Sequence, residues 1–311
     1  MNKTPGLDCY KGMERISISS AQDFSRCPRL YFYRKGCGLQ ELEVHQALTF
    51  GEGIHKAMPS AMRMQEASAL KAFMKVWGVR DALEDPKRNS KRARAILQTF
   101  MANHRGDKAL YAIIPPPPSR TPIQDMSEDE VPFAVDVGLA VPFVGKVDAV
   151  GRHRDTHEVY AVEYKTSSRF GSLFVGAFTT HPQVLGYTTA LAILMEEEVV
   201  GCVVEALLVA KVKTDTLTLP FTIQDHQVVS FLEWLEGVVE GVQRCEDCGC
   251  WPKDVSACTS LPCHGMPGFP CRYQRLCMVE DWQSLKDMYR VERYDMFASA
   301  PLPTTTEKSD G

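Results

Sequence analysis

Apolar side chains recur at helical spacing through the first third of the chain. Phe24, Cys27 and Tyr31 follow one another at intervals of three and four, and Ser20 with Asp23 is typical of a capping box. A proline at 28 either kinks this helix or opens a second one. Further helices are predicted over residues 50–77 and 89–104, before a proline-rich loop from 115 to about 130.

Strand-like segments follow. Residues 131–151 and 158–167 are rich in Val and Phe and are interrupted at Gly and polar residues, which predicts consecutive antiparallel strands. A hairpin turning near Asp155 and Thr156 would pair positions whose numbers sum to 311. The pattern then predicts a helix at 181–198, a buried strand at 199–212, an edge strand at 216–223 and a long helix at 225–244.

This order of elements predicts an α/β (α+β) fold with one central mixed sheet flanked by helices. Four segments are expected. They are a helical N-terminal part (1–130), a core of sheet and helices (131–244), a cysteine-rich segment (245–290) and a disordered tail (291–311).

Composition narrows the class of protein. The 311 residues are 44% hydrophobic and 24% charged, which is typical of a globular chain, and the net charge is -4. Binding of nucleic acid would therefore need a local basic patch on an acidic background. No apolar run approaches the length of a membrane span, and the N-terminus has no apolar signal core, so we expect a cytoplasmic protein without a membrane partner.

One strand carries charge where a buried strand would be apolar. Glu163 and Lys165 lie two residues apart and therefore share one face. In the predicted hairpin, where the numbers of paired positions sum to 311, Asp148 faces Glu163 across neighbouring strands. Two carboxylates so close repel unless a cation lies between them, and oxygen ligands with free positions suit Mg²⁺ or Mn²⁺. The alternative is a solvated surface hairpin, because Glu-x-Lys is common by chance.

The motif resembles a known signature. Asp148, followed after a hairpin by Glu163-Tyr164-Lys165, is similar to the motif of the PD-(D/E)XK nuclease superfamily. Members of that superfamily share a restriction-endonuclease-like core, which agrees with the fold predicted above.

Four further segments resemble the RecB-like branch, which includes the CRISPR adaptation nucleases and many phage exonucleases. Gly51 and His55 resemble its Gly-x-x-x-His helix start, and Gln183 and Tyr187 resemble its Gln-x-x-x-Tyr helix. The other two are similar to its N-terminal Cys-Pro segment and its C-terminal cysteine cluster. All the matches follow the family order from about residue 17 to 277.

The resemblance implies a metal-dependent DNA nuclease, an exonuclease that hydrolyses phosphodiester bonds of single-stranded or end-containing DNA. It implies Mg²⁺ or Mn²⁺ held by His55, Asp148, Glu163 and the backbone carbonyl of Tyr164, with Lys165 positioning the attacking water. His55 could instead be an ordinary helix histidine.

Other residues and other functions stay open. Gln183 and Tyr187 would contact DNA or the lysine, or would be ordinary core residues. A role in DNA recombination or repair, with a recombination or replication protein as partner, is also implied. The alternatives are a structure-directed endonuclease and a non-catalytic DNA-binding protein on a nuclease fold.

Eleven cysteines are present, and seven of them crowd into residues 245–277. In a reducing compartment such crowding favours metal or iron–sulfur ligation. The resemblance implies a 4Fe-4S cluster on Cys27, Cys258, Cys271 and Cys277, with Cys263 as a rival ligand and a four-cysteine Zn²⁺ site as the alternative. The remaining three, Cys245, Cys248 and Cys250, have no place in the family pattern and are predicted to be free thiols in a turn, with a second metal site as the alternative.

Candidate DNA contacts come from a basic segment and an aromatic segment. The basic residues are Lys87, Arg88, Lys91, Arg92 and Arg94. They lie near a helix start, where the helix dipole disfavours cations unless phosphates compensate; a solvated charged face is the alternative. Aromatic side chains of residues 31–33 are expected to stack on bases of a strand that enters from an end.

Overall fold

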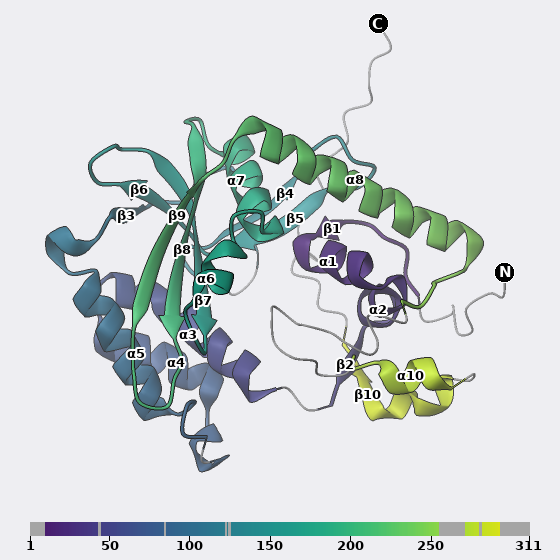
Figure 1. Cartoon of the computed structure of the whole chain (residues 1–311), viewed down its shortest axis with the longest axis horizontal. Helices are drawn as coiled ribbons and strands as arrows, with labels where there is room; N and C mark the ends of the chain where they lie inside the picture. The colour runs from purple at the N-terminus through teal and green to yellow at the C-terminus, as the bar shows by residue number, and fades with distance from the viewer. Residues whose placement is uncertain are drawn as a thin grey trace, which may run out of the picture. The chain divides into compact units, whose positions relative to one another are not determined.

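The computed structural model describes residues 10–42, 45–83, 85–121, 123, 126–254, 271–279 and 282–292 (Figure 1). Contacts divide the chain into two compact units, which cut across the four segments expected from the sequence. The first unit comprises residues 1–43, 134–145 and 229–311, and the second unit comprises 44–133 and 146–228.

The second unit is built on a mixed five-stranded sheet in the order β3-β6-β7-β8-β9. Its strands are β3 (Tyr111–Ile114), β6 (Ala149–His153), β7 (Val159–Ser167), β8 (Val199–Leu208) and β9 (Thr216–Thr222). β7 and β8 pair in parallel, and the other neighbours pair antiparallel. The buried strand and the edge strand predicted from residues 199–223 are thus confirmed as β8 and β9.

The β6–β7 hairpin has the predicted register. Ala149 pairs with Val162 and Arg152 with Val159, so that paired numbers sum to 311. The alternation that places Glu163 and Lys165 on one face therefore places Val162 and Tyr164 on the other, within the main apolar core.

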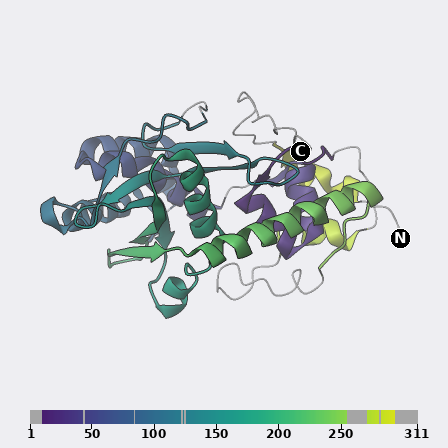
Figure 2. The ribbon, with the colours of Figure 1, turned by 90° about the horizontal axis from the view of Figure 1, so that it is seen from above.

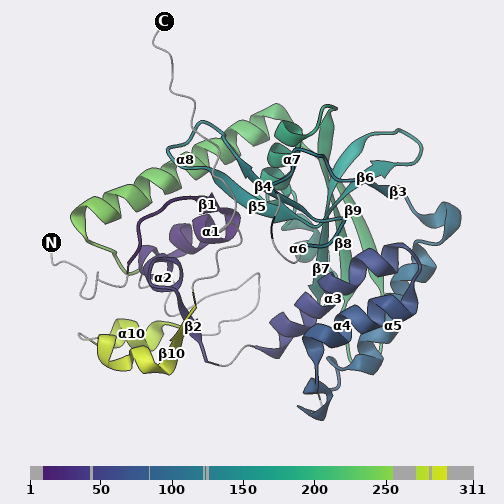
Figure 3. The ribbon, with the colours of Figure 1, turned by 180° about the vertical axis from the view of Figure 1, so that it is seen from behind.

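Helices of the second unit account for that core. They are α3 (Gln46–Met62), α4 (Glu66–Trp77), α5 (Ser90–Asn103), α6 (Ser172–Gly176) and α7 (Pro182–Leu194), with short 3-10 turns at Arg80–Leu83 and Gly106–Lys108. Figure 3 brings α3, α4 and α5 to the front of the sheet, where Phe50, Phe73 and Trp77 pack edge to face or stacked. The helix predicted over 50–77 is in fact two, because Met64 adopts a left-handed backbone with φ of 60°.

Glu205 of β8 is fully buried on the core side of this sheet. Its carboxylate accepts hydrogen bonds from Tyr111 Oη at 2.7 Å, Thr218 Oγ1 at 2.9 Å and the His104 ring at 3.0 Å. Burial lowers the pKa of His104, but the hydrogen bond and the charge of Glu205 outweigh it and raise that pKa above its ordinary value.

Replacing Glu205 by alanine is expected to lower the free energy of unfolding by about 3–5 kcal/mol, because the buried His104 and Tyr111 and the half-buried Thr218 lose their acceptor. Since the His104 pKa is raised on folding, the stabilisation from the ion pair is complete below the unfolded pKa of about 6.5 and is lost as pH rises through the folded value. Denaturant unfolding should therefore show a larger difference between wild type and Glu205→Gln at low pH than at high pH. Equal differences at both would contradict a charged pair.

The first unit contains shorter elements and one long helix. They are β1 (Ile16–Ser17), α1 (Ile18–Arg26), α2 (Pro28–Tyr31), a π-helix (Phe32–Gly36), β2 (Leu39–Glu41), α10 (Gln274–Met278), a 3-10 segment (Trp282–Met288) and β10 (Tyr289–Val291). Figure 2 shows α8 (Asp225–Cys248) as one continuous helix, most of it in this unit. The sequence-predicted helix at 225–244 is therefore confirmed, with one further turn.

Three local predictions are corrected here. The capping box is formed by Ser17 and Ser20, because Ser20 already lies inside α1. Pro28 opens α2 rather than kinking α1. Residues 131–147 do not continue the antiparallel meander: β4 (Val131–Val135) and β5 (Phe143–Val147) belong to a separate sheet of order β1-β5-β4, in which β5 pairs with β1 in parallel.

The long helix also corrects the prediction for the three extra cysteines. Cys245 and Cys248 lie in the last turns of α8, not in a turn between elements. All three of Cys245, Cys248 and Cys250 are free thiols, as expected.

Across the described parts of the chain, no helix combines the length and apolar character needed to span a bilayer.

Candidate active site

Two carboxylates meet where β6 begins opposite β7. Asp148 directly precedes β6, and its Oδ2 accepts a hydrogen bond of 2.9 Å from the backbone N–H of Tyr164. Glu163 is only 3% exposed, and its carboxylate accepts a short hydrogen bond from Lys165 Nζ. The hairpin thus brings Asp148, Glu163 and Lys165 into one site, as the register predicts.

Helix α3 supplies the histidine. His55 Nδ1 lies 3.5 Å from Asp148 Oδ2, and its ring meets the Tyr164 ring edge to face at 6.4 Å. Gly51, one turn earlier, permits this approach, since a Cβ there would stand 3.2 Å from Thr166 Oγ1 on β7. The two residues of the motif therefore act differently: Gly51 lets α3 approach β7 closely, and His55 directs a ring nitrogen toward Asp148.

The two carboxyl groups have opposite pKa shifts. Burial acts to raise the pKa of Asp148, but the adjacent His55, the Tyr164 N–H and Lys165 lower it to about 2. Burial raises the pKa of Glu163 to about 7, with the charge of Asp148 adding to the rise and Lys165 opposing it. Asp148 therefore ionises more readily than an ordinary carboxyl group, and Glu163 ionises less readily.

Helix α7 places two polar residues next to these carboxylates. Gln183 Nε2 donates to Tyr187 Oη at 3.2 Å, so the four-residue spacing puts both on one face, as predicted. Burial raises the Tyr187 pKa far above its ordinary value, and the charges of Glu163 and Asp148 raise it further. Tyr187 is consequently a neutral hydroxyl within the electrostatic range of both carboxylates.

A second cluster of charged side chains, which includes sequence neighbours of Asp148 and His55, was not anticipated from the sequence. Glu130 Oε1 is contacted by Lys146 Nζ at 2.5 Å and by Lys56 Nζ at 3.3 Å. Burial acts to raise the Glu130 pKa, but these lysines and a Ser127 N–H lower it below its ordinary value. The sequence feature that could have indicated the two lysines is their position: Lys146 lies two residues before Asp148, and Lys56 directly follows His55.

The basic segment at 87–94 is largely engaged by the protein. Arg88 pairs with Asp85 at 3.0 Å, Arg94 with Glu66 at 3.8 Å, and Arg92 donates to two backbone carbonyls at residues 212 and 213. A DNA contact by these residues remains a prediction; within the described part of the chain, the Lys87 and Lys91 side chains make no hydrogen bond or ion pair.

The aromatic segment at 31–33 cannot stack on bases, which corrects the expectation above. Phe32 and Tyr33 are 0% and 1% exposed. Phe32 packs against Trp251 at 5.5 Å between ring centroids, and Tyr33 packs against Tyr273 at 5.7 Å. These rings form the core of the first unit.

Only part of the predicted set of iron–sulfur ligands lies within the described residues, and that part belongs to the first unit. Cys258 and Cys263 fall outside them. Cys27 is buried, and its Sγ receives the backbone N–H of residue 254 at 3.4 Å, while Lys253 Nζ contacts the carbonyl of Cys277 at 2.5 Å. Cys27 and Cys277 therefore both adjoin the segment at 253–254, and the cluster remains a prediction.

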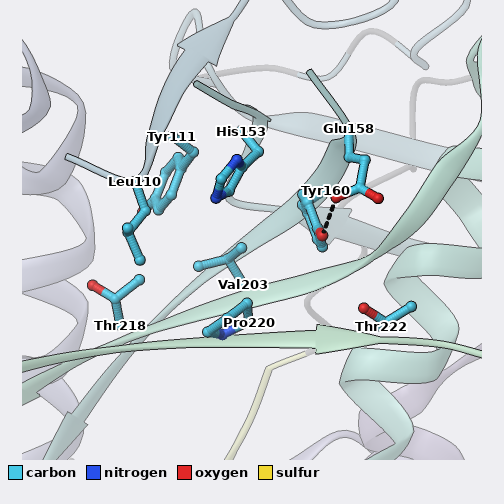
Figure 4. A pocket seen from close by; sticks show the side chains of 9 residues that line it. All are labelled: Leu110, Tyr111, His153, Glu158, Tyr160, Val203, Thr218, Pro220 and Thr222. Atoms are coloured by element: carbon cyan, nitrogen blue, oxygen red, sulfur yellow. Dashed lines mark hydrogen bonds between the residues drawn. The ribbon is translucent and has the colours of Figure 1, made fainter. Parts of the chain in front are cut away.

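A cavity of about 210 Å³ lies elsewhere on the second unit (Figure 4). Tyr111, Tyr160, Val203 and Thr218 line it together with Leu110, His153, Glu158, Pro220 and Thr222. Tyr160 Oη donates to Glu158 at 3.0 Å at one side. None of the carboxylates, the lysine or the histidine of the site borders this cavity, so it is separate from the site.

Comparison with known families decides the class of protein. The family model of the PD-(D/E)XK nuclease superfamily matches residues 15–278. The chain belongs to this superfamily. PD-(D/E)XK nucleases are phosphodiester hydrolases and generally use Mg²⁺ or Mn²⁺.

Solved structures with some similarity include one described as a "Putative exonuclease" from Eubacterium rectale. It has 14% sequence identity and a TM-score of 0.46, and the match covers 79% of this chain and 86% of that one. The crystal structure of SSO0001 matches with 13% identity and a TM-score of 0.29 over 72% and 75% of the two chains. These similarities are too low to add to the assignment. No curated protein matches the chain.

The donor set of this PD-(D/E)XK site suits a divalent metal in type and charge. It offers the buried Glu163 carboxylate, the partly buried Asp148 carboxylate, a backbone carbonyl and an imidazole, and a cation would offset the burial and the Asp148 charge that raise the Glu163 pKa. Within the described residues, no group of three or more His, Cys, Asp or Glu side chains is already arranged to hold a metal ion. Lys165 and His55 instead hold the carboxylates in ion pairs.

Proposed function

We propose that this PD-(D/E)XK protein is a metal-dependent deoxyribonuclease that degrades single-stranded DNA from free ends. The observation that carries the proposal is the pair of carboxylates Asp148, partly buried, and Glu163, buried, which His55 and Lys165 contact on one edge of the hairpin. A decayed, non-catalytic DNA-binding protein would not be expected to keep two carboxylates so close together, one of them buried, because their proximity costs stability.

The metal would be held by Asp148, Glu163, the Tyr164 carbonyl and His55. When bound, Mg²⁺ or Mn²⁺ would polarise the phosphoryl group, acidify water and offset charge on the leaving oxygen. Asp148 is suited to ligation because its low pKa keeps it ionised at neutral pH. Glu163, with a pKa near 7, needs the neighbouring cations to hold it as a carboxylate.

Lys165 would position the attacking water. Its ammonium already contacts Glu163 from the same strand face, and the β7 backbone fixes its direction. Gln183 and Tyr187 form a hydrogen-bonded pair on α7 that would contact the DNA backbone or restrain the lysine. We also propose that Cys27, Cys258, Cys271 and Cys277 hold a structural 4Fe-4S cluster in the first unit.

End dependence separates an exonuclease from an endonuclease. We expect the protein to degrade a linear single-stranded DNA much faster than the same molecule in closed circular form, measured by acid-soluble nucleotide release with Mn²⁺. The matched control is the circle cut once by a separate enzyme before the assay. Equal rates on circle and cut circle would instead favour a structure-directed endonuclease.

A further inference from the structure

An aromatic row follows the strand that carries Lys165. Phe170 and Phe174 have ring centroids 5.5 Å apart, and Phe174 and Phe178 are 5.1 Å apart. The row spans the loop after β7, helix α6 and the turn before α7. Consequently it lies along the connection between the element bearing Lys165 and the element bearing Gln183.

One end of this row is anchored and the other is open. Phe178 is 6% exposed and packs on Phe221 of β9 at 6.2 Å and on the His181 ring at 5.6 Å. Phe170 and Phe174 are only half-buried, and Leu173 beside them is 86% exposed. Packing explains Phe178, but it does not explain an apolar surface that stays open to solvent on the connection between Lys165 and Gln183.

We propose that Phe170 and Phe174, with Leu173, form a stacking platform for unpaired bases of the DNA strand whose phosphate occupies the site. The proposal rests on the function proposed above and adds to it the surface that would favour single strands. Base–aromatic stacking tolerates any sequence, because every base has a flat face. A duplex hides those faces between its neighbouring base pairs, so only an unpaired strand can use the platform.

The reach from site to platform fits a few nucleotides. Phe170 lies five positions after Lys165, which limits the distance between their backbones to about 18 Å along an extended chain. Ser167 Oγ contacts the backbone of Arg169, and its carbonyl accepts from the Val209 N–H, so the start of the loop is tied to the sheet. Bases stacked on the row would therefore fix the position of the strand relative to Lys165.

The test measures binding rather than cleavage, in the full chain carrying Asp148→Asn and with Mn²⁺ present. The probe is a fluorescent single-stranded oligothymidine. We expect Phe174→Leu to weaken binding by about fivefold or more, since stacking contributes about 1–3 kcal/mol per base. Phe174→Tyr keeps a flat ring and should retain the affinity, whereas leucine keeps only the apolar bulk.

An abasic oligonucleotide of the same length completes the comparison. Removing the bases should weaken binding to the Asp148→Asn protein that keeps Phe174. On this abasic strand, the added change Phe174→Leu should then lower the affinity little further. An unchanged affinity of Phe174→Leu for oligothymidine, or an equal loss on the abasic strand, would overturn the platform. Because no cleavage is measured, an inactive wild-type protein would contradict the proposed function without deciding this result.

Discussion

Replacing Asp148 by asparagine is expected to lower the rate of DNA cleavage by at least about 10²–10³-fold, measured as nucleotide release with Mn²⁺ present. The carboxylate charge is lost, but the amide oxygen can still accept the 2.9 Å hydrogen bond from the Tyr164 N–H. The fold should therefore survive, and circular dichroism and the melting temperature should remain close to wild type.

The matched control for this variant is Glu158→Gln. Glu158 is an exposed carboxylate at the far end of the same hairpin, where it accepts hydrogen bonds from Thr156 and Tyr160. The same change of charge there should leave cleavage unaltered. Full activity in Asp148→Asn, or equal losses in both variants, would show that the carboxylate has no special role.

Replacing Cys27 by alanine is expected to bleach a brown, anaerobically purified protein and to destabilise its first unit. Cys27 is separated from Cys271 and Cys277 by more than two hundred residues. A cluster that joins these cysteines would therefore close a very long loop, and by analogy with a disulfide its loss should cost about 2–5 kcal/mol. Absorbance at the charge-transfer bands of the iron–sulfur cluster measures the loss of colour, and the midpoint of unfolding measures the loss of stability.

A cysteine outside the proposed ligand set provides the comparison. Cys248→Ala removes an exposed thiol at the end of α8 and should preserve both colour and stability. Colourless wild-type protein containing one zinc per chain by elemental analysis would replace the iron–sulfur proposal with a zinc site, since four thiolates suit either. An equal loss of colour in both variants would contradict the ligand set.

Local sequence patterns predicted the arrangement of the site to a useful degree. The period of two along a strand and the turn signals near Asp155 fix the hairpin register, and that register alone brings Asp148 opposite Glu163. The four-residue spacing of Gln183 and Tyr187 likewise fixes a shared helix face. These features depend on neighbours along the chain, which is why the sequence reveals them.

Features that depend on distant contacts were missed. The parallel pairing of Ile16 with Phe143 joins segments far apart in sequence, and no local pattern distinguishes it from a meander. Burial of residues 31–33 follows from packing on Trp251 and Tyr273, which lie more than two hundred residues later. The break at Met64 reflects a left-handed backbone that lacks the usual glycine signal.

Metal-dependent release of nucleotides from linear single-stranded DNA tests the central claim most directly. Wild-type protein should release acid-soluble nucleotides when Mn²⁺ is added, stop when EDTA is added, and resume when Mn²⁺ is restored in excess. Asp148→Asn, purified in parallel, should release almost none. A folded wild-type protein that leaves every linear DNA intact with Mn²⁺, or equal release by both proteins, would contradict the assignment of this site as a nuclease centre.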